Sequence, residues 1–190
     1  MQEDIKTAIN RILVDREVKN NVDFLVKYMP EIKYMIGFPH NHPHHHLDVW
    51  SHTLLALENL ESNDLETNMA LLLHDIGKPF SYQDAEVRHF KGHELESEKI
   101  ARTILNRLGY DHKFIDNVCY LVRTHDTMIN VNNLDNTEEM IKKRLNIQYA
   151  DAKAHNPITV EKRLNLLDEV RKNLSINSND KNKLLFKKQS

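Results

Sequence analysis

The segment MALLLHDIGKP, residues 69–79, places a histidine and an aspartate side by side at the end of an apolar run. The run predicts a buried helix, and Gly77 with the proline that follows predicts that this helix ends at a polar site. Adjacent helical residues point about 100° apart, so His74 and Asp75 cannot face one partner in the same way. A metal ion suits them, because the two carboxylate oxygens can reach the ion that binds the imidazole and a second ion. The pair alone fits equally a buried histidine bonded to its neighbour's carboxylate.

Histidine is over-represented, with 12 residues against 6 tyrosines, and the histidines cluster. Imidazole is a common metal ligand and titrates near neutral pH, so this excess of histidine indicates a chemical role. Imidazoles and carboxylates fall on five successive predicted helices, where the apolar pattern faces the core. The predicted metal ligands are His52, His74, Asp75, His93, His125 and Asp151. They suffice for one or two divalent ions, with Asp75 as the bridge, and favour Fe, Mn, Co, Ni or Zn over Ca or Mg.

The elements that position these ligands are predicted to be helices throughout. Glycine and proline are few, and no alternating apolar pattern is sustained, so the fold class is all-α. Helices are expected over about 5–13, 22–29, 32–36, 47–60, 65–75, 94–108, 112–125, 137–154 and 159–173. Asp111 and Asn136 are the expected N-caps of two of them. Residues 37–46, GFPHNHPHHH, are predicted to be a loop, and residues 80–91 a polar connection.

The chain is expected to form one domain. Residues 1–45 are predicted to be N-terminal helices that pack on the core, and residues 46–174 the metal-binding helical domain. Residues 175–190 are polar and lysine-bearing, which predicts a mobile tail.

Composition limits the classes of function. A formal net charge of -2 argues against a general nucleic-acid binder, although a local basic patch remains compatible with it. The lone cysteine, Cys119, excludes a disulfide framework and a thiolate metal site, and is expected in the core. The chain shows no secretory signal and no stretch of about 18 apolar residues. The expected location is therefore the cytoplasm, with no membrane partner.

The order of these residues, with HDIGKP among them, resembles the HD-domain metal-dependent phosphohydrolase superfamily. In particular, LDVWSHT, ALLLHDIGKP, RHFKGHE, LVRTH and YADAKAH, across residues 46–155, resemble segments of the HD domain of bacterial tRNA nucleotidyltransferases. The resemblance implies a single-domain HD-type helical bundle. It implies metal ligands at His52, His74, Asp75 and Asp151, with His93 and His125 completing a second site as in binuclear members. No nucleotidyltransferase head precedes the motif, so CCA addition is not expected.

Substrate contacts are predicted from position. Lys78 directly follows the doublet and can meet a phosphate oxygen as a point charge, although a solvated lysine is the alternative. Arg88 and Lys91 are further candidates for anion contacts, and surface charge is the simpler interpretation of both. His46 precedes LDVWSHT and is expected to face the site.

Other polar residues are expected to matter less. The four histidines of the loop, His40, His42, His44 and His45, are predicted to be exposed or adventitious metal binders. Asp126 is either an acceptor behind a metal ligand or an outward carboxylate. His89, His112 and His155 are predicted to be surface or packing residues.

These observations favour a metal-dependent phosphohydrolase, either a phosphomonoesterase or a phosphodiesterase. Its substrate is expected to be a phosphorylated small molecule, a nucleotide or a small RNA-end-like molecule, attacked by a metal-bridging hydroxide. Asp75 and Lys78 are the predicted catalytic residues. The alternative is a non-catalytic regulatory or RNA-binding module with a structural metal. A di-iron oxygenase, which the superfamily also contains, is a third hypothesis.

Overall fold

The computed structural model describes the backbone of residues 4–83 and 86–187, with side chains as far as Leu174. Within this part of the chain the secondary structure is helical, apart from two isolated β-bridges. The α-helices are α1 Ile5–Val14, α2 Val22–Tyr28, α3 Val49–Asn59, α4 Leu65–Leu73, α5 Lys78–Ser81, α6 His93–Arg107, α7 His112–Thr124, α8 Glu138–Lys153 and α9 Glu161–Lys187. Two 3₁₀-helices, η1 Val18–Asn21 and η2 Pro30–Tyr34, flank α2. The all-α prediction is confirmed.

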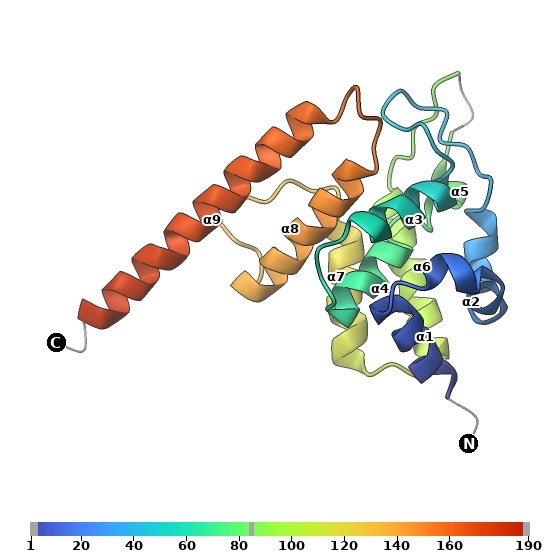
Figure 1. Ribbon diagram of the computed structural model, residues 1–190, viewed down its shortest axis with the longest axis horizontal. Helices are drawn as coiled ribbons and strands as arrows, with labels where there is room; N and C mark the ends of the chain where they lie inside the picture. Colours follow the sequence, from blue (N-terminus) through green and yellow to red (C-terminus); the bar gives the residue numbers. More distant parts are fainter. Residues whose placement is uncertain (1–3, 84–85, 188–190) are drawn as a thin grey trace.

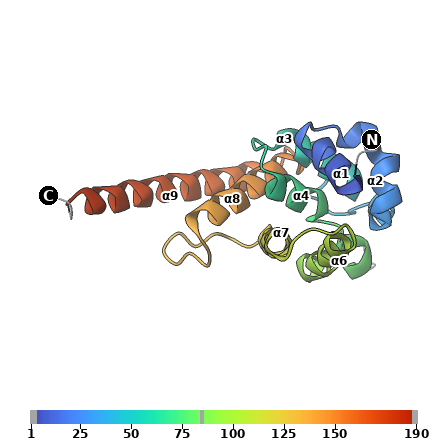
Figure 2. The ribbon, with the colours of Figure 1, turned by 90° about the horizontal axis from the view of Figure 1, so that it is seen from below.

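Helix α4 occupies the centre of the fold because its residues from Thr67 to Leu73 are buried all round. Helices α1, α2 and α3 lie on one side of it and α6 and α7 on the other (Figure 2). These helices share one apolar core with part of α8. Because α4 ends in the middle of this core, the residues that follow it are delivered to a buried position.

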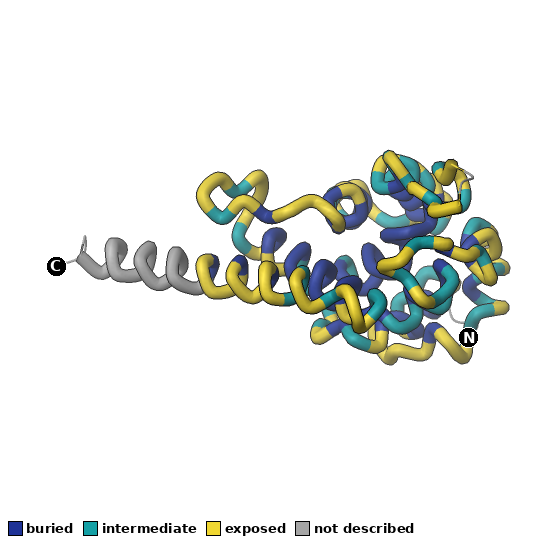
Figure 3. The backbone as a smooth tube through the Cα atoms, turned by 90° about the horizontal axis from the view of Figure 1, so that it is seen from above, coloured by how far each residue is buried: buried dark blue, intermediate teal, exposed yellow. Residues whose placement is uncertain are grey.

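A second, smaller apolar cluster joins α9 to α8. Leu167, Val170 and Leu174 follow the helical spacing along α9 and pack against Ile141 and Leu145 of α8. Helix α9 lies along α8 and then extends away from the body (Figure 1), and much of its described surface is exposed (Figure 3).

Side-chain caps fix several helix starts. Asp111 accepts from the Phe114 amide at 2.9 Å, which confirms the predicted cap of α7. The cap of α8 is Thr137, whose hydroxyl accepts from the Met140 amide, so the prediction of Asn136 was wrong by one residue.

Two predicted boundaries differ from the structure. The polar connection begins with a short helix, α5, because residues after Gly77 resume helical geometry. Helix α9 continues to Lys187, beyond the predicted end near residue 173, through much of the segment expected to be a tail. Residues 188–190 of that segment lie outside the described residues, and the domain boundaries remain predictions. No described helix combines the length and apolar character needed to cross a membrane.

Candidate metal centre

The structure brings all six predicted metal ligands into one buried cluster. They come from the first turn of α3, the ends of α4 and α7, the start of α6 and the last turn of α8. The cluster consists of His52, His74, Asp75, His93, His125 and Asp151, each of which is less than 9% exposed.

Asp75 divides the cluster, because its two carboxylate oxygens face different histidines. Oδ1 lies 3.4 Å from Nε2 of His93 and 3.7 Å from Nε2 of His125. Both histidines belong to the layer formed by α6 and α7 (Figure 2). We call His93, His125 and Oδ1 of Asp75 the outer half-site.

The other oxygen of Asp75 belongs to a deeper group. Oδ2 lies 3.3 Å from Nε2 of His74 and 3.8 Å from Nε2 of His52. Oδ1 of Asp151 lies 2.9 Å from the His52 nitrogen and 3.6 Å from that of His74. We call His52, His74, Asp151 and Oδ2 of Asp75 the inner half-site.

Hydrogen bonds to the main chain orient all four imidazoles. A carbonyl oxygen can only accept, so each Nδ1 carries a proton and each Nε2 faces the carboxylates, to which it can donate when protonated and beside which it can bind a cation when it is not. The Nδ1 bonds run from His52 to Ala154 (3.2 Å), His74 to Leu71 (2.7 Å), His93 to Phe90 (2.8 Å) and His125 to Val122 (2.7 Å). The last three reach back three residues, a geometry that a histidine at a helix end can adopt.

These residues fit divalent cations. Nε2 of His74 and Oδ1 of Asp75 are buried without a hydrogen-bond partner among the described residues, and Oδ2 of Asp75 is paired with the Lys78 ammonium at 2.7 Å. Buried polar atoms in native proteins are normally satisfied, and a coordinated cation satisfies such atoms. Burial lowers the pKa of His74, but the carboxylates of Asp75 and Asp151 outweigh it and raise that pKa to about 10. The carboxylates therefore demand positive charge at Nε2 of His74, which a proton or a metal ion can supply.

Lys78 is buried within the centre and is not a solvated lysine. Its ammonium lies 2.7 Å from Oδ2 of Asp75 and 3.1 Å from Nε2 of His40. The short helix α5 turns the chain back after Asp75, which brings the side chain of Lys78 inward.

His40 was predicted to be exposed or an adventitious metal binder, and its exposure was predicted wrongly. Its Nδ1 donates to the Leu47 carbonyl at 2.8 Å, and its Nε2 accepts from Lys78. Burial lowers its pKa to about 4, and the Lys78 cation adds to this against the effect of Asp75. An isolated bridge between Pro39 and Asp48 folds the loop back onto α3 and turns His40 inward. The run GFPHNHPHHH carries no periodicity that distinguishes one histidine from another, so the sequence held no signal for this.

His155 also belongs to the centre rather than to the outer surface. Its Nε2 lies 3.4 Å from Oδ1 of Asp151, and its ring packs edge-on against that of His45. His155 lies in the bend just after α8, four residues beyond Asp151, and this short spacing is a signal that the sequence did contain. Both histidines border a cavity of about 180 Å³ above the cluster, which we call the metal cavity.

Asp126 matches neither alternative that the sequence left open, because its carboxylate faces the Nε2 atoms of two predicted metal ligands. Oδ2 lies 3.4 Å from Nε2 of His125 and 3.5 Å from that of His93. Burial raises the pKa of Asp126, but the imidazole of His125 and the guanidinium of Arg163 hold it below its usual range. Arg163 of α9, which sequence reasoning did not single out, lies 3.0 Å from Oδ1 of Asp126 and 3.2 Å from Oδ2 of Asp151.

The remaining substrate candidates divide into two groups. Arg88 borders a second cavity of about 170 Å³, the side cavity, together with His89, Phe90 and His93. Its guanidinium lies over the Tyr82 ring and donates to the Pro39 carbonyl at 2.9 Å. Lys91 and His46 are exposed and border neither cavity, so their roles in substrate binding stay predictions.

The part of the chain that carries the metal centre matches a known family. The family model described as HD domain matches residues 44–167. The CC-adding tRNA nucleotidyltransferase of Thermus thermophilus is 33% identical over 137 residues, which cover 65% of this chain and 31% of that protein. A multifunctional CCA protein of Halorhodospira halophila is 34% identical over 57% of this chain and 27% of its own length. The A-adding tRNA nucleotidyltransferase of Deinococcus radiodurans is 35% identical over 43% of this chain and 20% of its own length. The matches thus span less than a third of these relatives, and no solved structure matches the chain.

Proposed function

The chain belongs to the HD domain family, and from this premise we propose that it is a metal-dependent phosphohydrolase acting on a phosphomonoester or phosphodiester. The supporting observation is the pair of buried half-sites that share Asp75, in which Oδ1 of Asp75 and Nε2 of His74 have no hydrogen-bond partner among the described residues. When bound, two divalent cations there would activate water for attack on phosphorus and neutralise phosphoryl oxygens.

The residues around the cavity supply the contacts for an anionic substrate. Lys78 borders both cavities and is held by Asp75 and His40, so its ammonium can meet a phosphoryl oxygen as negative charge develops. His45 and His155 border the metal cavity and can donate hydrogen bonds to the same group. The proposed role of the protein is therefore to hold the phosphoryl group against the half-sites.

The shape of the site supports a small substrate or the end of a longer one. The metal cavity and the side cavity share His42, His45, Lys78 and Asp126, so they adjoin. A phosphoryl group in the first would direct its substituent toward the second, where Arg88 and the ring of Phe90 offer a cation and an aromatic face. A nucleotide or an RNA end consists of a phosphoryl group with a substituent of this kind. The names of the matched relatives, which are tRNA nucleotidyltransferases and CCA proteins, agree with such a substrate.

The test is metal analysis followed by a hydrolysis screen. Purified protein would be loaded with Mn²⁺, Fe²⁺, Co²⁺, Ni²⁺ or Zn²⁺ and assayed on nucleoside monophosphates, nucleoside cyclic phosphates and aryl phosphoesters. We expect two equivalents of metal and hydrolysis by the wild type. Asp75→Asn should bind metal at least about 100-fold more weakly and lose activity.

Lys78→Gln separates substrate contact from metal binding. We expect it to retain metal while kcat/KM falls by about 10²-fold to 10³-fold, because one donor to the phosphoryl group is lost. Lys99→Gln is the matched control, since Lys99 is exposed on α6 and pairs with Glu96. Protein that takes up metal but hydrolyses no phosphoester would support the non-catalytic module, and failure to take up any metal would refute both proposals.

A further inference from the structure

In the outer half-site, the imidazoles of the two histidines predicted as metal ligands face each other. Nε2 of His93 lies 3.3 Å from Nε2 of His125. In both rings Nδ1 donates to a main-chain carbonyl, so in the neutral tautomers both Nε2 atoms present lone pairs. Two lone pairs at this distance repel, and a cation between them removes the repulsion. Such a cation would need ligands in addition to the two imidazoles.

Asp126 supplies the missing oxygen. Its Oδ2 lies 3.5 Å from the His93 nitrogen and 3.4 Å from the His125 nitrogen, so the three atoms form a nearly equilateral triangle. Atoms that each bind one ion at about 2.1 Å stand about 3.0 to 3.4 Å apart, which is close to this spacing. Asp126 lies in the turn that follows α7, with its side chain 43% exposed, and therefore lies between the half-site and solvent.

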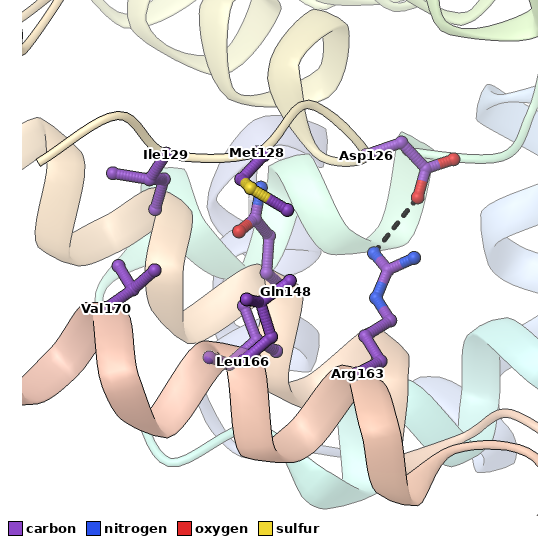
Figure 4. Close-up of a pocket in the computed structure, with 8 residues that line it drawn as sticks. Asp126, Met128, Ile129, Gln148, Arg163, Leu166 and Val170 are labelled. Atoms are coloured by element: carbon purple, nitrogen blue, oxygen red, sulfur yellow. Dashed lines mark hydrogen bonds and ion pairs between the residues drawn. The ribbon is translucent and has the colours of Figure 1, made fainter.

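Arg163 holds Asp126 in this orientation. The same nitrogen, Nη2, lies 3.0 Å from Oδ1 of Asp126 and 3.2 Å from Oδ2 of Asp151. Arg163 reaches up from α9 to the carboxylate of Asp126 (Figure 4). Because Arg163 takes one oxygen of each carboxylate, the other oxygen of each faces the imidazoles.

The second apolar cluster explains why α9 can position this guanidinium. Leu167 and Val170, one and two turns after Arg163, are buried against α8 and Ile129. Beside the ion pair lies a cavity of about 120 Å³, bordered by Met128, Gln148 and these apolar residues (Figure 4). Arg163 borders this cavity and also the metal cavity, so the packing of α9 is connected directly to the centre.

We propose that Asp126 is a further metal ligand of the outer half-site, and that Arg163 is a positioning residue that orients Asp126 and Asp151 together. Each half-site then offers two imidazole nitrogens and two carboxylate oxygens. Three carboxylates do not neutralise two divalent cations, so the centre stays cationic and suited to an anionic substrate. This inference rests on the metal centre of the proposed function but not on its hydrolytic activity.

The test is a Mn²⁺ titration of metal-free protein, with free Mn²⁺ measured by electron paramagnetic resonance. The wild type should bind two equivalents. Asp126→Asn should weaken one equivalent by at least about 10-fold and leave the other unchanged, because only the outer half-site loses an oxygen. Arg163→Gln should weaken both by about 10-fold to 100-fold, and Arg163→Lys should recover part of the loss, since one donor suffices to reach the two oxygens.

The matched controls are Asp116→Asn and Arg102→Gln. These two residues form an exposed Asp–Arg pair at 2.8 Å between α7 and α6, away from the centre. Both control variants should bind Mn²⁺ as the wild type does. Melting temperatures of the metal-free proteins detect any variant that fails to fold, and Asp126→Glu, which keeps the charge, should then retain more outer binding than Asp126→Asn.

The outcomes separate this inference from the proposed function. A wild type that binds no metal contradicts the metal centre itself. A wild type that binds two equivalents, with Asp126→Asn and Arg163→Gln unchanged in both affinities, overturns the inference and leaves the proposed function standing.

Discussion

The inner and outer half-sites share Asp75 but differ in what holds them in place. In the inner half-site, His52 and His74 are fully buried, and His52 already lies 2.9 Å from Asp151. Lys78 adds a cation 2.7 Å from the shared Asp75. The inner half-site therefore has favourable contacts of its own before any ion binds.

The outer half-site has fewer such contacts. Its closest contact joins the facing nitrogens of His93 and His125, and Asp126 stands at its solvent edge. Its histidines also come from α6 and α7, a layer on one side of α4 (Figure 2), so their separation depends on how these helices pack. The two half-sites are therefore not equivalent, although they share a ligand. We expect the inner ion to bind first and the binding of the outer ion to depend on the packing of α6 and α7. Three predictions test this dependence.

The largest effect is expected from Gly77→Ala. Gly77 is needed for close approach and not for a left-handed conformation: an added Cβ would lie 2.6 Å from the His93 carbonyl oxygen and 2.5 Å from the Ser97 amide nitrogen. Both are backbone atoms, so the start of α6 must move and carry His93 with it. We expect about 3 kcal/mol less unfolding free energy and loss of the outer equivalent of metal, measured by denaturant titration and Mn²⁺ binding.

Gly109→Ala is the control for this variant. Gly109 has φ +74°, and an added Cβ would meet nothing within 4 Å. The strained conformation should cost about 1 kcal/mol while both metal equivalents remain. Two equivalents in Gly77→Ala with wild-type affinity would show that the packing of α6 does not set the outer half-site.

A smaller effect is expected from Arg144→Met. Arg144 of α8 is buried, and it donates to the carbonyls of Thr124, Thr127 and Met128, which enclose His125 and Asp126. Loss of these bonds should lower the free energy of unfolding by about 2 kcal/mol, because buried carbonyls lose their donors. The turn after α7 would then be less firmly held, so the affinity of the outer half-site for metal should also fall, as measured by the same titration.

Arg123→Met makes the matched comparison, because Arg123 is exposed on α7 and pairs with Glu98 at 3.5 Å. Its effect should stay within about 0.5 kcal/mol. Equal stability of the two variants would contradict a positioning role for Arg144.

The smallest effect concerns Cys119, which reports on the contact between α6 and α7. Its thiol lies 3.8 Å from the Glu98 carbonyl of α6, and burial raises its pKa to about 11. Only the thiolate reacts with a disulfide reagent, so labelling of the metal-loaded protein should rise about tenfold per pH unit from pH 8 to 10. After chelation, labelling should be faster and should level off near pH 9, because an opened layer gives the thiol a pKa of about 8.5. Identical pH profiles with and without metal would contradict a role for the outer ion in holding the layer closed.

Much of the helical framework could be predicted from local pattern. The apolar spacing that ends in His125 forecast α7, and Asp111 forecast its start, because caps and helical faces depend on residues within a few positions of each other. The six residues predicted as metal ligands also came together, since each lay on or beside a predicted helix at a point where the apolar pattern faces the core.

Residues outside such patterns could not be predicted in this way. His40 lies in a loop without periodicity, and a bridge between Pro39 and Asp48 turns it inward. Arg163 resembles any charged residue at the start of a helix until α9 packs against α8 and directs it toward Asp126.

Residue types at short spacing were enough to predict most of the helices, the cluster of histidines and the His-Asp pair at the end of a buried helix. The tertiary structure alone decided how the oxygens of Asp75 are shared, that Asp126 turns inward and that Arg163 holds it. Those relations join segments far apart in the chain, and only the packing of helices against α4 and α8 sets the distances between them.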